Sequence, residues 1–134
     1  MRLLTQIILV SIGSTVGGLT RWGVTVGMAR LFKTTFPVGT LFINLTGSLF
    51  LGWFMTIFSN RLLNAEGKWW IKPEDLRLMI AVGFTGAYTT FSTFEYEAHS
   101  LLGDGDGLAA TTYIAGSVFL GLLAIRAGVL LARW

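Results

Sequence analysis

The chain has 134 residues, of which 53% are hydrophobic and 13% are charged, and it contains no cysteine. An ordinary soluble domain has roughly 25% charged residues, so this composition favours a lipid bilayer as the solvent for the apolar side chains. The absence of cysteine excludes disulfides and cysteine-ligated metals within the chain. The net charge is +3, but the basic residues are dispersed and do not form the patch that nucleic-acid binding requires.

Four segments are long and apolar enough to be membrane-spanning helices, since a helix needs about 20 residues to cross the hydrocarbon. They are Leu3–Met28, Phe36–Phe58, Leu76–Leu102 and Leu108–Leu131. The longest polar connection, from Ser59 to Asp75, contains charged residues beside Trp69 and Trp70, which is typical of a loop at the membrane surface. We therefore predict an all-α membrane protein with four transmembrane helices in one domain, residues 1–134.

The N-terminal segment has a second interpretation. Met1 and Arg2 precede an apolar run, as in a signal peptide. The apolar character continues as far as Phe32, however, and a signal peptide would not explain the later segments. We therefore prefer a first transmembrane helix.

Basic residues outside the spans predict the orientation. The side that carries both termini has more of them than the opposite side, namely Arg2, Arg61, Lys68, Lys72, Arg77 and Arg133 against Arg30 and Lys33. Because cytoplasmic loops carry an excess of lysine and arginine, this distribution favours both termini in the cytoplasm.

Small residues recur four positions apart within the spans. The pairs are Gly13 with Gly17, Gly23 with Gly27, Ser48 with Gly52, and Ser117 with Gly121. Small residues on one face let membrane helices approach closely. We expect close packing to be the role of most of these residues.

Polar side chains inside the membrane are costly unless they are satisfied, so they indicate a pathway. Thr40, Asn44 and Ser48 lie at intervals of four in the second span and share one helix face. Tyr113 and Ser117, followed by Gly121, repeat this spacing in the fourth span. The sequence therefore predicts two polar stripes.

The middle of the third span, from Gly83 to Phe94, combines glycines with a run of β-branched threonines that weakens a helix. One interpretation is a break, whose freed carbonyls could coordinate a cation such as sodium. The alternative is a continuous helix in which the threonine hydroxyls bond back to their own turn. The residues alone leave both open.

Several other residues in the spans allow two interpretations each. Phe91 and Phe94 share one helix face, which favours packing but also allows ring edges to face a dehydrated anion. Arg21 interrupts the first span and either snorkels to the interface or attracts anions to a vestibule. Glu95 and Glu97 stand near the end of the third span, before the only histidine, His99, where they could be ordinary exposed charges.

Motifs in three spans resemble those of the Fluc (CrcB) family of bacterial fluoride channels. The run from Gly86 to Phe94, GAYTTFSTF, is followed by Glu95 and Glu97. The second span has the pattern G-T-L-x-x-N-x-x-G from Gly39 to Gly47, and the first has G-x-x-x-R ending at Arg21. The resemblance covers essentially the whole chain.

This resemblance implies an antiparallel, dual-topology homodimer of four-helix subunits, with the third helix broken near its middle, in the bacterial inner membrane. Two pores would export cytoplasmic fluoride passively. The fluoride pathway would comprise Asn44, Phe91, Phe94, Thr40, Ser117, Tyr113, Arg21 and Glu97. Backbone carbonyls of Gly86 and Thr89 would hold a structural sodium ion at the dimer interface. Some family members have a serine where this chain has Gly121.

One feature of the sequence opposes part of this prediction. An antiparallel dimer of one chain requires insertion in both orientations, whereas the basic residues favour one. We prefer a bias too weak to fix the orientation over an oppositely inserted paralogue as partner. A four-helix coupled transporter of the multidrug type is the alternative function, but the first two spans lack the carboxylate that such exporters need. An enzyme is disfavoured, since one histidine cannot form a bis-histidine haem site and no triad spacing is evident.

Overall fold

A computed structural model of the chain describes residues 2–62 and 72–134, and in this part every element is helical. The predicted surface loop with Trp69 and Trp70 lies mostly outside the described residues. The elements in chain order are α1 (Arg2–Leu31), α2 (Val38–Ile57), η1 (Phe58–Leu62), α3 (Pro73–Arg77), η2 (Leu78–Thr85), α4 (Gly86–Tyr88), α5 (Phe91–Gly103) and α6 (Gly107–Leu131). The prediction of an all-α protein is confirmed for the described residues.

Three of the helices are long and apolar enough to cross a membrane: Arg2–Leu31, Val38–Asn60 and Gly107–Leu131. They correspond to the first, second and fourth predicted spans, with ends that differ by a few residues. The remaining predicted span contains the helical run from α3 through η2 to α4, and then α5. The chain is therefore a multi-pass membrane protein.

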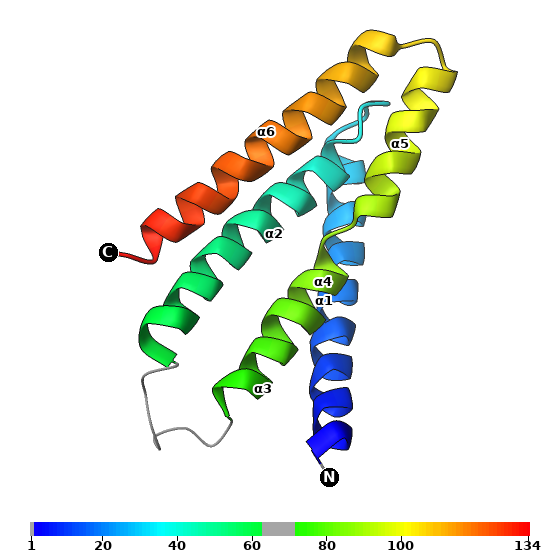
Figure 1. Cartoon of the computed structure of the whole chain (residues 1–134). Coiled ribbons are helices and arrows are strands. Elements are labelled where there is room, and N and C mark those ends of the chain that lie inside the picture. The colour runs from blue at the N-terminus through cyan, green and yellow to red at the C-terminus, as the bar shows by residue number, and fades with distance from the viewer. Residues whose placement is uncertain (1, 63–71) are drawn as a thin grey trace.

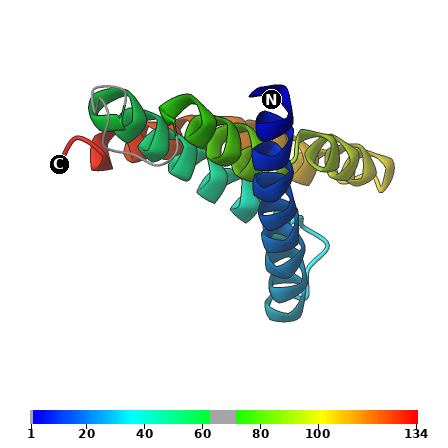
Figure 2. The same cartoon turned by 90° about the horizontal axis from the view of Figure 1, so that it is seen from below.

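The helices run alternately in opposite directions, so that both termini lie at the same end of the molecule (Figure 1). α2 and α6 run side by side in the same direction, α1 packs against η2 and α4, and α5 packs against the first half of α6. Seen from below, the second half of α1 projects away from the layer that the other helices form (Figure 2).

Glycines bring α1 into backbone contact with η2. A methyl group built on Gly13 would overlap the carbonyl oxygen of Met79, and one built on Gly17 would overlap that of Phe84. Gly83 returns the contact, since its added carbon would lie 2.8 Å from the carbonyl oxygen of Val10. The predicted packing role is confirmed for this pair, because only glycine lets two backbones approach so closely.

The other predicted pairs of small residues differ in whether they contact another helix. Gly52 meets the backbone of Ile125, and Gly128, which the prediction did not single out, meets the backbone of Leu49. Around Gly23 and Gly27, however, an added carbon would meet nothing within 4 Å among the described residues. The prediction of close packing for this second pair is wrong within one subunit, because the second half of α1 projects away from the other helices (Figure 2).

The contacts between α2 and α6 fix their register. Thr40 and Tyr113 reach the same carboxylate, Ser48 approaches the position of Gly121, and Gly52 meets Ile125. In each pair the same sequence offset separates the two residues. The polar stripes of the second and fourth spans therefore face one another, and Asn44 is level with Ser117.

Candidate functional site: a polar row beside an interrupted helix

The helix that begins at Pro73 ends at Tyr88, and the next one begins at Phe91. Between them Thr89 (φ −78°, ψ 159°) and Thr90 (φ −150°, ψ 117°) have extended backbones. The Thr90 hydroxyl oxygen caps α5 by accepting a hydrogen bond from the Thr93 amide at 3.3 Å. β-Branched residues favour extended backbone, and threonine is a good N-cap, so the local sequence accounts for the interruption.

Asn44 of α2 holds the interrupted backbone in place. Its Nδ2 donates to the carbonyl oxygen of Thr90 at 3.1 Å, and its Oδ1 accepts from the Thr90 amide at 2.9 Å. The side chain thus satisfies both backbone groups of a buried residue that lacks a helical partner for them, which is required in a membrane. One of the two N–H groups on Nδ2 remains for another acceptor.

Arg21 lies against the same interruption. Its Nη1 donates to the carbonyl oxygen of Thr89 at 3.4 Å, and the residue is half-buried. Within the subunit, the guanidinium therefore contacts the backbone of another segment. The structure therefore brings α1, α2 and the interrupted helix together at Thr89 and Thr90.

Glu97 of α5 joins α2 to α6. Its Oε1 accepts from the Thr40 hydroxyl at 2.8 Å, and its Oε2 accepts from the Tyr113 hydroxyl, also at 2.8 Å. Tyr113 is fully buried, and its ring packs against Phe94 and, edge to face, against Phe36. Glu97 is therefore not an ordinary exposed charge, whereas Glu95 and His99 are exposed in this chain.

Ser117 is half-buried, and its hydroxyl oxygen is the one buried side-chain polar atom in the described part of the chain that has no hydrogen-bond partner. It lies on α6 at the level of Asn44, one turn beyond Tyr113. On the α2 side, an open hollow of about 220 Å³ is lined by Asn44, Ser48, Thr85, Thr90 and Phe91, among others. The Ser117 hydroxyl, which has no partner, and the hollow beside Asn44 therefore lie at the same level of α6 and α2.

The two phenylalanines of α5 differ in their surroundings. Their ring centroids are 5.9 Å apart, but Phe94 is 9% exposed and Phe91 is 70% exposed. Phe94 packs against Tyr113 at 5.1 Å between ring centroids, while Phe91 points away from this cluster. The shared face that the spacing predicts is thus split between the interior and the surface of the subunit.

The carbonyl groups of Gly86 and Thr89 lie at the end of α4. The Thr90 amide, which would close the next helical turn on the Gly86 carbonyl, donates instead to Asn44. Gly86 is exposed, and no described residue lies within 4 Å of the position of an added side-chain carbon. Neutral carbonyl oxygens suit a hard cation such as sodium, so the donor chemistry fits, although the Thr89 oxygen also receives the Arg21 guanidinium.

Comparison with known proteins shows the family of the chain. The sequence model of the family described as "CrcB-like protein, Camphor Resistance (CrcB)" matches residues 8–129. The chain belongs to the CrcB family. A CrcB-family relative from Trichormus variabilis, named "Fluoride-specific ion channel FluC", is 46% identical over 126 residues, which cover 94% of this chain and 87% of the relative. Proteins of the same name from Chloroflexus aurantiacus are 40% identical over 98% of both chains.

Sequence reasoning on this CrcB-family chain named the polar residues but missed their partners. The Asn44 clamp on Thr90 and the Glu97 bridge between Thr40 and Tyr113 join residues from different helices. A signal for the first was present, since an interrupted helix requires a side chain to satisfy its backbone. For the second, the only sequence signal was a carboxylate within an apolar segment.

Proposed function

We propose that the chain forms a fluoride channel that lets the anion leave the cytoplasm passively down its electrochemical gradient. The observation that carries this proposal is the buried Ser117 hydroxyl without a partner, level with the Asn44 amide. A hydroxyl without a partner, at the same level as an amide that has one N–H left to donate, suits a small anion that has lost its water. The names of the CrcB-family relatives, fluoride-specific ion channels, support the same function.

The selectivity of the proposed pathway has a simple physical basis. Fluoride is small and strongly hydrated, so a pore must replace its water with closely placed donors. The remaining Asn44 N–H and the Ser117 hydroxyl supply such donors, and buried Phe94 lies along the same side. A narrow path of this kind would deny larger chloride a similar fit.

Glu97 restricts the next step of the pathway. The hydroxyl groups of Thr40 and Tyr113 both donate to its carboxylate, so they are not available to a passing anion. For fluoride to reach either hydroxyl, that hydroxyl would have to leave the carboxylate, whose negative charge repels the anion. Arg21 would raise the local anion concentration at the mouth of the path.

The alternative functions have less support. α1 and α2 contain no acidic residue, whereas a proton-coupled drug exporter of four helices needs one there. The relatives in the CrcB family carry the name of a channel rather than an enzyme, and the chain is accordingly not an enzyme.

We further propose that α3 to α5 cross the bilayer as one interrupted third span and that two copies assemble as an antiparallel homodimer. α5 exposes Ser92, Thr93, Glu95 and His99 together with Phe91. Lipid cannot satisfy such a polar face, but a second copy can, and Phe91 would then border a pore shared by both chains. Helical spans are typical of a bacterial inner membrane, since outer-membrane proteins are barrels.

In this assembly the carbonyls of Gly86 and Thr89 from both copies would hold a structural sodium ion at the dimer interface. When bound, the ion would neutralise carbonyl dipoles that the interruption leaves without helical partners. Asn44 fixes Thr90, and thereby the position of the preceding carbonyls. Nothing in this role requires the sodium ion to be transported.

Replacing sodium with N-methylglucamine is therefore expected to shift the purified protein from dimer to monomer, because that cation is too large for four carbonyl oxygens. Crosslinking and size-exclusion chromatography measure the dimer fraction without measuring conduction. Readdition of sodium should restore the dimer. An unchanged dimer fraction after exhaustive exchange would argue against the sodium site.

The function itself is tested in liposomes loaded with potassium fluoride. We expect valinomycin to trigger rapid fluoride efflux, measured with a fluoride electrode, and little chloride efflux from matched liposomes. Ser117→Ala should lower the fluoride rate by about 10-fold or more, since a hydrogen bond to a charged group contributes about 1.5–3 kcal/mol.

Ser11→Ala is the matched control, because Ser11 is an exposed serine of α1, and it should leave the rate unchanged. An intact fluoride gradient with the wild-type protein would refute the channel. Slow, saturating and proton-coupled efflux would instead favour the transporter.

A further inference from the structure

Arg126 is a charged side chain without a partner on a membrane-spanning helix. It lies in α6, about one and a half turns before the helix ends at Leu131. It is exposed, and it forms no hydrogen bond or ion pair with any residue that the structure describes. Because an unpaired charge at this depth is costly, the guanidinium requires an anion or the membrane surface.

The faces of α6 place this arginine toward lipid. Ile125 and Gly128 pack against α2, so the side of α6 that they occupy is covered. Leu122, Leu123 and Leu130 are 64%, 50% and 44% exposed, and they lie on the same outer side as Arg126. An apolar surface that would suit acyl chains therefore adjoins the charge.

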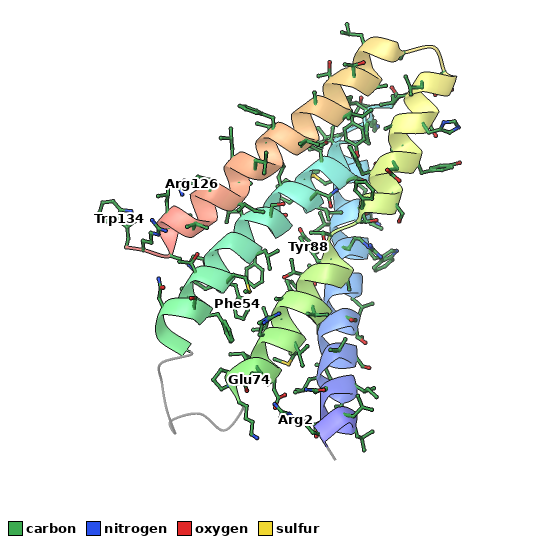
Figure 3. The ribbon with its side chains drawn as sticks, viewed as in Figure 1. Arg2, Phe54, Glu74, Tyr88, Arg126 and Trp134 are labelled. Atoms are coloured by element: carbon green, nitrogen blue, oxygen red, sulfur yellow. The ribbon has the colours of Figure 1, made fainter. Side chains whose placement is uncertain are left out.

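The C-terminus adds a second charge and an aromatic ring. Arg133 lies just beyond the end of α6 at Leu131 and is also exposed. Trp134 is 99% exposed. Arg126 and Trp134 lie together at this end of α6, whereas acidic Glu74 lies away from them on α3 (Figure 3). This corner of the subunit is consequently basic, with no acidic residue in α6.

We propose that Arg126 and Arg133 bind the phosphate of an anionic phospholipid whose acyl chains lie along Leu122, Leu123 and Leu130. Guanidinium groups bind phosphate in a bidentate manner, and an arginine near a helix end extends its charge to the headgroup level. Trp134 would lie at the same level, where indole rings are favoured. A free phosphate could use the charges but not the leucines, and this difference favours a lipid.

The test measures binding of palmitoyl-oleoyl phosphatidylglycerol to the purified, delipidated protein by native mass spectrometry. Because a basic residue near an anionic surface contributes about 1 kcal/mol, Arg126→Gln and Arg133→Gln should each weaken binding by about fivefold, and the double variant by about 30-fold. Phosphatidylcholine should bind more weakly than phosphatidylglycerol and should be insensitive to these changes.

Arg2→Gln is the matched control, since Arg2 is an exposed arginine at the same end of the molecule but distant from Arg126 (Figure 3). It should change phosphatidylglycerol binding by less than twofold. If the control lost as much phosphatidylglycerol binding as the double variant, the loss would reflect only the lower net charge of the protein, and the proposed site would be refuted. Competition by millimolar inorganic phosphate would reassign it to a free anion. A dimer that dissociates in Arg126→Gln while lipid binding persists would assign the arginine to a protein interface instead.

Discussion

Fluoride flux is expected to disappear when Asn44 is replaced by aspartate. An ionised carboxylate would repel both the anion and the Thr90 carbonyl oxygen, which now accepts from Nδ2 at 3.1 Å. A protonated carboxyl group would use its single proton at that carbonyl and would have no donor left for fluoride. Both protonation states therefore predict a loss of at least about 100-fold, since a like charge or a missing ionic hydrogen bond costs a few kcal/mol. Liposome efflux is the measurement.

Asn44→Ala tests how much Asn44 contributes to stability, separately from its role in conduction. It removes both bonds to the Thr90 backbone without adding charge, and each buried group left unsatisfied costs about 1–3 kcal/mol. We expect Asn44→Ala to lower the thermal stability of the detergent-solubilised protein more than Asn44→Asp does, because aspartate still accepts from the Thr90 amide. Flux within twofold of wild type in the aspartate variant would remove Asn44 from the pathway.

Gly13→Ala is expected to disrupt the contact between α1 and η2. The new methyl group would overlap the Met79 carbonyl oxygen, and a backbone atom cannot rotate away as a side chain can. Overpacking of this kind costs about 1–3 kcal/mol. Unfolding in sodium dodecyl sulfate, followed by circular dichroism, should show the loss, together with a lower yield of folded protein.

Gly18→Ala gives the comparison within the same helix. An added carbon there meets nothing within 4 Å in the described part of the chain, and alanine is favoured over glycine in a helix by about 1 kcal/mol. The stability of this variant should equal or exceed that of wild type. Equal destabilisation by both substitutions would show that the α1–η2 backbone contact is not what holds the first helix.

The number and placement of the helices could be predicted from the sequence because the signal is local. A run of about 20 apolar residues is sufficient to predict a span, and α1, α2 and α6 begin and end within a few residues of the prediction. The threonine run likewise marked the segment where the extended residues Thr89 and Thr90 occur. These features depend on residues that are close together in the sequence, so the local sequence is sufficient to predict them.

The partners of the polar residues could not be predicted, because they depend on how distant helices pack. Glu97 receives one hydroxyl from α2 and one from α6, and its spacing in the sequence gives no indication of either. Arg21 contacts Thr89 because the α1 glycines bring the two backbones together. The different exposure of Phe91 and Phe94 also follows from packing, since Tyr113 covers only the second ring.

Residues of α2 and α6 pair with one another at several successive positions, and this pairing limits where residues can be inserted into or deleted from the chain. Adding or removing one residue turns the rest of a helix by about 100° and moves it by 1.5 Å. Such a change between Thr40 and Gly52, or between Tyr113 and Ile125, would turn every later residue of that helix away from its partner on the other helix. Insertions and deletions should consequently be confined to the connecting loops and the helix ends, while these two stretches keep a fixed length.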